Sequence, residues 1–145
     1  MLAHDPDPAD VRAAVGFAVA ALEIVDSRIA EWDITFGDTV ADNASSGLFV
    51  LGRERVPLDA FEPVAADMTM TVGGQVVSEG NGAACLGDPL RALAWLAAKA
   101  RELGDPLRAG QVVLSGALGP MVPVAAGADV VAQIGGLGTV RATFG

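Results

Sequence analysis

Residues 68–78 read Met-Thr-Met-Thr-Val-Gly-Gly-Gln-Val-Val-Ser, with two glycines between two runs of strand-forming residues. Valine and threonine favour strands, and Gly73 and Gly74 can take the positive φ angles that a two-residue hairpin turn requires. The stretch therefore predicts a β-hairpin with strands over residues 68–72 and 75–78. It makes strands a main component of the fold.

The residues after this hairpin predict one long helix and further strands. Asp88 and Pro89 form an N-cap and first-turn pair, and a stripe of leucine and alanine at helical spacing leads to a stop at Gly104. Strands are expected over residues 112–115, 130–134 and 139–144, the last two joined through the glycine-rich residues 135–138.

The residues before the hairpin predict a helix, a strand and a polar connection. Asp7 and Pro8 open a first helix, expected from about Pro8 to Ala20 because apolar residues recur at helical spacing. In a strand over residues 22–29, alternation places Glu23 on the face opposite Leu22. A short helical turn from Asp38 to Asn43 and a buried strand over residues 48–51 should follow.

These elements predict the α+β class. A few helices and many short strands separated by glycines favour a β-rich roll or barrel-like fold with mixed sheets and two main helices. The length of 145 residues suits a single domain over residues 1–145. Hydrophobic residues make up 52% of the chain, so self-association is expected.

Composition also excludes some classes of function. The formal charge of −9 and the lack of a basic cluster argue against a protein that binds nucleic acid. The longest apolar stretch, residues 15–22, is too short to cross a bilayer, and no membrane association is expected. The single cysteine, Cys85, has apolar neighbours, which favours a buried thiol in a reducing, cytoplasmic setting.

Four groups of residues could carry chemistry. Glu23 stands between Leu22 and Ile24, so its charge requires a partner: either an arginine (Arg12 or Arg28) or a metal ion. Asp26 and Arg28 are spaced to pair with each other. The polar residues 42–46 suit either a hydrogen-bonded turn or a site.

The fourth group lies at the end of the strand expected over residues 112–115. Ser115 and Gly116 place a hydroxyl and flexible backbone where N–H groups could meet an anionic ligand. The spacing fits neither a nucleophile elbow nor a P-loop, so hydrolysis by a triad and nucleotide binding have no support.

Four segments, residues 21–28, 41–47, 80–95 and 113–124, together resemble one enzyme family. They are similar to the carboxyl-terminal half of the 2-keto-4-pentenoate hydratases and 4-oxalocrotonate decarboxylases, within the fumarylacetoacetate hydrolase superfamily. The resemblance implies the carboxyl-terminal domain fold of that superfamily, in incomplete form. It also implies a lyase that adds water to 2-hydroxypenta-2,4-dienoate to give 4-hydroxy-2-oxopentanoate in the breakdown of aromatic compounds. Decarboxylation of 2-oxo-3-hexenedioate is the alternative.

The same resemblance implies the site residues. Mg²⁺ or Mn²⁺ would be held by three carboxylates, two from an early Glu-x-Glu motif and the third from Glu23. Asn43, Ser45 and Ser46 would line the pocket of a small 2-oxo acid, and Ser115 with Gly116 would meet its carboxylate. The resemblance assigns no catalytic acid or base in this chain.

The chain departs from the family pattern because it contains no Glu-x-Glu. A single carboxylate should hold Mg²⁺ weakly or not at all, since Mg²⁺ prefers six oxygen ligands. The chain could be a fragment, a half that joins a complementary amino-terminal half, or a relative without catalysis that acts as a subunit or binding module. The expected assembly is a homo-oligomer or a pair of complementary halves.

Overall fold

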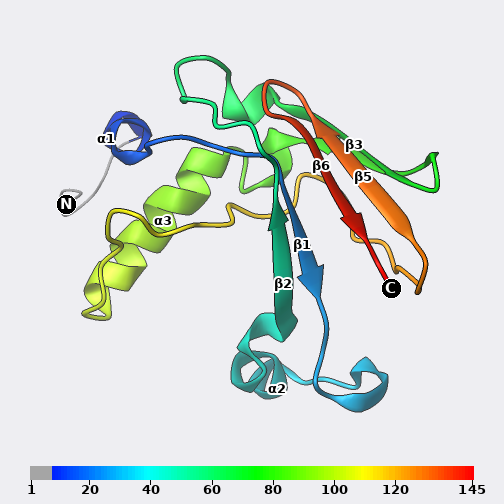
Figure 1. Cartoon of the computed structure of the whole chain (residues 1–145). Coiled ribbons are helices and arrows are strands. Elements are labelled where there is room, and N and C mark those ends of the chain that lie inside the picture. The colour runs from blue at the N-terminus through cyan, green and yellow to red at the C-terminus, as the bar shows by residue number, and fades with distance from the viewer. Residues whose placement is uncertain (1–7) are drawn as a thin grey trace.

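Two β-sheets and three α-helices form the part of the chain that the structure, a computed structural model, describes, which is residues 8–145 (Figure 1). The α+β class is confirmed. One detail differs from the expected mixed sheets, because every strand pair within residues 8–145 is antiparallel. Tight turns join β3 to β4 and β5 to β6, and such turns connect only antiparallel neighbours.

The larger sheet contains the predicted hairpin and the carboxyl-terminal strands. Its order is β4-β3-β5-β6, and its strands are β3 (Asp67–Val72), β4 (Gln75–Asn81), β5 (Asp129–Ile134) and β6 (Gly138–Thr143). Gly73 and Gly74 have φ angles of 56° and 83°, as the hairpin turn requires. The hairpin and the strands β5 and β6 are therefore confirmed.

The smaller sheet is a ribbon of two strands, β1 (Ala21–Val25) and β2 (Ser46–Leu51). It runs away from the rest of the molecule, with α2 at its far end (Figure 1). The pairing shifts between Ile24 and Val25, where a Cβ on Gly47 would lie 2.8 Å from the Ile24 carbonyl oxygen. The strand ends at Val25 rather than at the predicted residue 29, because the following residues turn toward residues 42–46.

The long helix is confirmed. It is α3 (Pro89–Glu102), where the Asp88 side chain caps the Leu90 N–H at 2.8 Å and Gly104 follows with a φ of 85°. The helix α2 (Phe36–Ala41) begins earlier than predicted because Thr35 and Asp38 form a capping box. Short 3₁₀ turns cover Ala30–Trp32, Asn43–Ser45, Pro63–Ala65 and Gly82–Ala84.

The first helix is shorter than predicted. It is α1 (Pro8–Ala14), whereas the sequence predicts a helix to Ala20, and the predicted cap Asp7 lies outside the described residues. Ala18 instead exchanges two backbone hydrogen bonds with Val56, at 2.8 and 2.9 Å, and Gly52 N–H donates to Ala20. These pairings between distant segments replace the helical hydrogen bonds.

The core consists of two small clusters. One lies against the larger sheet and contains Ala20, Ala66, Met68, Ala132, Ile134, Leu137 and Val140. The other joins α1 to α3 through Val11, Leu58 and Leu90. Within the described residues, no helix is long and apolar enough to span a membrane.

Two strand predictions are wrong in an informative way. The strand β2 is expected to be buried, but Leu48 and Phe49 are 72% and 50% exposed. Residues 112–115 are expected to form a strand, but they lie outside both sheets. Both segments are apolar, but within residues 8–145 the Leu48 and Phe49 side chains stay exposed and no strand pairs with residues 112–115.

Candidate functional site

Glu23 lies on an uncovered face of the β1–β2 ribbon. It pairs directly with Phe49, and the next pair on this face is Ala21 with Leu51. Glu23 and Phe49 are exposed, and Leu51 is 40% exposed. Leu22 and Val50 point the other way, against the core, as predicted from the alternation. The ribbon thus presents a carboxylate within an exposed apolar surface.

The arginine explanation for Glu23 is wrong. Arg12 pairs with Glu62 at 2.9 Å, and Arg28 pairs with Asp42 at 2.6 Å. Within residues 8–145, no ion pair or hydrogen bond engages the Glu23 side chain. The Glu23 carboxylate is therefore available to a group outside the described chain.

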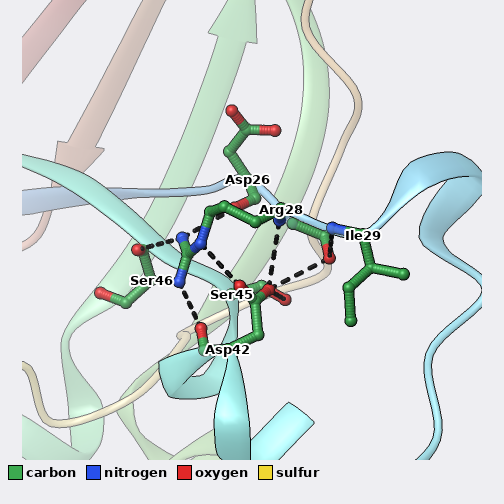
Figure 2. A network of polar contacts seen from close by, with 7 residues as sticks. Asp26, Arg28, Ile29, Asp42, Ser45 and Ser46 are labelled. Carbon is green, nitrogen blue, oxygen red and sulfur yellow. Dashed lines mark hydrogen bonds and ion pairs between the residues drawn. The ribbon is translucent and has the colours of Figure 1, made fainter. Parts of the chain in front are cut away.

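Arg28 holds the polar connection against the end of β1 (Figure 2). Its guanidinium pairs with the Asp42 carboxylate and donates to the backbone carbonyls of Asp26, Asp42 and Ser46. The predicted pairing of the Asp26 and Arg28 side chains is wrong, because the contact is to the Asp26 backbone carbonyl, at 3.0 Å. The spacing of Asp26 and Arg28 in the sequence could not reveal that Arg28 binds a more distant segment, residues 42–46.

The connection held by Arg28 has a strained backbone. Asn43, Ala44 and Ser45 have φ angles of 52°, 55° and 56°, a left-handed conformation that costs a residue with a Cβ about 1–2 kcal/mol. The Ser45 hydroxyl donates to Asp42 at 3.0 Å and is buried, while Asn43 and Ser46 are exposed. The turn therefore points Ser45 inward and leaves Asn43 and Ser46 at the surface.

Asp42 is the acceptor at the centre of this network. Burial raises the pKa of its carboxyl. Hydrogen bonds from Ser45, Ser27 and the Arg28 N–H, together with the Arg28 charge, lower the pKa by more than burial raises it, so that the net pKa is below its usual value. The carboxylate form is therefore favoured in the folded protein.

This lowered pKa predicts a loss of stability in acid. Because the folded-state pKa of Asp42 lies below the unfolded value of about 3.9, the stabilisation is complete above that value and is lost as the pH falls through the folded pKa. The free energy of unfolding in urea should decrease from pH 5 to pH 3, and Asp42→Asn should make that decrease shallower. Asp105→Asn, at an exposed ion pair with Arg108, is the control and should leave the decrease unchanged. Equal decreases in the wild type and Asp42→Asn would contradict the prediction.

Ser115 and Gly116 lie beside Cys85, in a different part of the chain. The Ser115 side chain is hydrogen-bonded to the Cys85 thiol, whose Sγ donates to the Ala117 carbonyl at 3.3 Å. Burial raises the pKa of Cys85, and the hydrogen bond with Ser115 offsets part of that rise. Cys85 is a free, buried thiol, as the sequence predicts. Among the described residues, no ion pair or side-chain hydrogen bond joins this group to Glu23 or Asn43.

The residues present do not by themselves form a metal site. Within residues 8–145, no three histidine, cysteine, aspartate or glutamate side chains are grouped to hold a metal ion. An open hollow is lined by residues 26–32, which include Asp26 and Glu31 but not Glu23. Glu23 suits Mg²⁺ as an oxygen ligand, but a site also needs ligands that this part of the chain does not supply.

The comparisons with known proteins bear on this incomplete site. The carboxyl-terminal domain model of fumarylacetoacetate (FAA) hydrolase matches residues 3–145. The chain belongs to the fumarylacetoacetate hydrolase family.

Relatives in this family are longer than the chain. It is 61% identical over 94% of its length to a 2-keto-4-pentenoate hydratase of Burkholderia vietnamiensis, and 58% identical to one of Paraburkholderia phymatum. In each case it covers 52% of the relative. The chain thus spans about half the length of the curated relatives it matches.

A solved family structure shows the same arrangement of elements. It is a 4-oxalocrotonate decarboxylase from Pseudomonas putida G7, complexed with magnesium and adipate, with a TM-score of 0.90 and 36% identity. The match covers 94% of this chain and 52% of the decarboxylase. The fold predicted from the resemblance is therefore confirmed for this half.

Proposed function

We propose that this chain is one domain, the carboxyl-terminal half of a cytoplasmic, metal-dependent hydratase. The proposed reaction adds water to 2-hydroxypenta-2,4-dienoate and yields 4-hydroxy-2-oxopentanoate. The 61% identity to a 2-keto-4-pentenoate hydratase is the observation that carries the proposal, since it extends over 94% of the chain. The exposed Glu23, without a partner in residues 8–145, supports it.

In this proposal Glu23 is one of three carboxylate ligands of Mg²⁺ or Mn²⁺. The other two would come from the half that this chain does not span. The metal, when bound, would act as a Lewis acid toward the oxygens of a 2-oxo acid. The β1–β2 pairing would fix the direction of Glu23, and the apolar neighbours Phe49 and Leu51 would exclude water from it once that face is covered.

The remaining predicted site residues divide into two groups. Asn43 and Ser46 are exposed and would line the pocket, while Ser45 would hold the turn through its hydrogen bond to Asp42. Ser115 and the Gly116 N–H would donate to the substrate carboxylate, as groups directed at negative charge do in other active sites. Gly116 suits this role because its φ of 121° is open to glycine and strained for other residues.

Decarboxylation of 2-oxo-3-hexenedioate is the second candidate. The observation that favours it is the TM-score of 0.90 to a 4-oxalocrotonate decarboxylase. The lower identity, 36% against 61%, places the hydratase first.

The two candidates can be tested by reconstitution. The chain would be co-expressed with the amino-terminal half of the Burkholderia vietnamiensis hydratase, which comprises the residues before the matched region. Both the hydration and the decarboxylation would then be assayed with Mg²⁺, with Mn²⁺ and with chelator. We expect metal-dependent hydration by the co-purified pair and no turnover by either half alone.

Each outcome of that experiment decides between the candidates. Decarboxylation without hydration would favour the second candidate. A co-purified pair that binds Mg²⁺ but turns over neither substrate would contradict both, and would leave this chain as a subunit or binding module.

A further inference from the structure

Residues 112–114 have the sequence of a strand but pair with no other segment of the described chain. The sequence, Val112-Val113-Leu114, has strong strand propensity, yet these residues lie in neither sheet. The segment from residue 111 to residue 124 contains no helix or strand (Figure 1). A strand sequence without strand structure needs a physical reason.

The missing hydrogen bonds supply that reason. Among the described residues, neither the N–H groups nor the carbonyl groups of residues 112–114 make a hydrogen bond to the backbone. The preceding Gln111 N–H still donates to Arg108, at 3.3 Å. Backbone polar groups that become buried must be hydrogen-bonded, and a neighbouring strand can pair those of residues 112–114 in succession.

The side chains alternate as in a strand with one covered face. Val112 and Leu114 are 58% and 37% exposed, while Val113 and Ser115 are half-buried. A period of two is the period of a strand. The exposed face is apolar, as the inner face of a larger sheet would be.

The following residues hold the segment firmly in place. The Ser78 hydroxyl donates to the Pro120 carbonyl at 2.8 Å, and the Cys85 thiol donates to that of Ala117 at 3.3 Å. Leu118 packs against the larger core cluster. The free edge is thus held by the fold before any partner arrives, which lowers the entropy cost of pairing.

The chain exposes more surface than is expected of a folded monomer of its size. The chain exposes 9274 Å², whereas a folded monomer of 14.6 kDa is expected to expose about 6,900 Å². The difference, about 2,400 Å², exceeds the roughly 800 Å² that each partner buries in a standard interface. The chain spans 52% of its relatives, so a segment of similar length remains to cover this surface.

We propose that residues 112–114 pair with a β-strand of the complementary amino-terminal half, which extends a sheet across the boundary between the two halves. The occupant is a strand with apolar residues at alternate positions facing Val112 and Leu114. The proposal rests on the proposed function only for the identity of the partner. Its evidence, the unpaired backbone and the exposed apolar face, is independent of the reaction.

Hydrogen exchange in the co-purified pair tests the pairing. The probe is the amino-terminal half of the Burkholderia vietnamiensis hydratase. The amides of residues 112–114 should exchange rapidly in this chain alone and at least about tenfold more slowly in the pair, because they gain hydrogen bonds. Val112→Glu should weaken the pair at least about tenfold, because it places a charge in an apolar contact. Val76→Glu is the matched control, since Val76 is 57% exposed on β4, and it should leave the affinity unchanged.

The outcomes separate this inference from the proposed function. A pair whose residues 112–114 exchange as in the free chain would overturn the inference, even if the pair is an active hydratase. Slow exchange in an inactive pair would support the inference and count against the reaction. Failure of the halves to associate, or slow exchange of these amides in the free chain, would also overturn it. If Val112→Glu lowers the thermal midpoint of the free chain, its affinity no longer tests the pairing. The exchange rates of residues 112–114 in the unsubstituted pair then decide whether the inference holds.

Discussion

Glu23→Gln is expected to lower kcat/KM for hydration by the reconstituted pair at least about a hundredfold, since the proposed role of Glu23 is that of a metal ligand, which supplies several kcal/mol of stabilisation. The substitution keeps the size of the side chain but replaces an ionised ligand with a neutral amide. Because Glu23 is exposed and unpaired in residues 8–145, the thermal midpoint of the chain should not change. The effect would therefore arise at the metal and not in the fold.

The measurement is kcat/KM for hydration as a function of Mg²⁺ concentration. Glu79→Gln is the matched control, because Glu79 is also an exposed glutamate on a strand, β4. It should leave both the rate and the Mg²⁺ dependence unchanged. If Glu23→Gln keeps the wild-type rate at the same Mg²⁺ concentration, Glu23 is not a metal ligand.

Gly80→Ala is expected to give a large loss of stability. A Cβ at Gly80 would lie 1.9 Å from the Leu118 carbonyl oxygen and 3.1 Å from the Gly119 Cα. Both are backbone atoms, so no side-chain rotation can relieve the clash, and the chain must separate from β4. A cost of about 3–5 kcal/mol is expected, a large part of the roughly 5–15 kcal/mol that stabilises a domain.

Urea denaturation followed by circular dichroism measures this loss. Gly16→Ala is the control, because a Cβ there has no neighbour within 4 Å. Its free energy of unfolding should stay within about 0.5 kcal/mol of wild type. A Gly80→Ala protein as stable as the Gly16→Ala protein would show that residues 118–119 do not cross β4 as described.

The elements that the sequence predicts correctly carry their own local signals. Gly73 and Gly74 determine the β3–β4 turn, and Asp88 with Pro89 determines the start of α3. The end of α1 carries no such signal, because Ala18 pairs with Val56, thirty-eight positions later. Pairings between distant segments are not visible in local periodicity, so the first helix is predicted too long.

In the candidate site, too, features with a local sequence signal are predicted correctly, and those that depend on distant contacts are not. Alternation along residues 22–25 places Glu23 opposite the core face, and the structure agrees. Spacing could not show that Arg28 pairs with Asp42, because that contact depends on how the chain returns after α2. Spacing also could not show that the Leu48 and Phe49 side chains of β2 are exposed. An apolar run looks the same whether its cover lies in the same chain or in another half.

The β1–β2 ribbon has a consequence for the chain inside a cell. A two-stranded ribbon is marginal in water by itself, and this one exposes Leu48 and Phe49 on opposite faces. Exposed apolar strands and unpaired edges are what chaperones and proteases encounter in incompletely folded proteins, and they also promote aggregation. If the proposed complementary half exists, copies made without it should therefore be short-lived, and its supply would set how much of this chain accumulates.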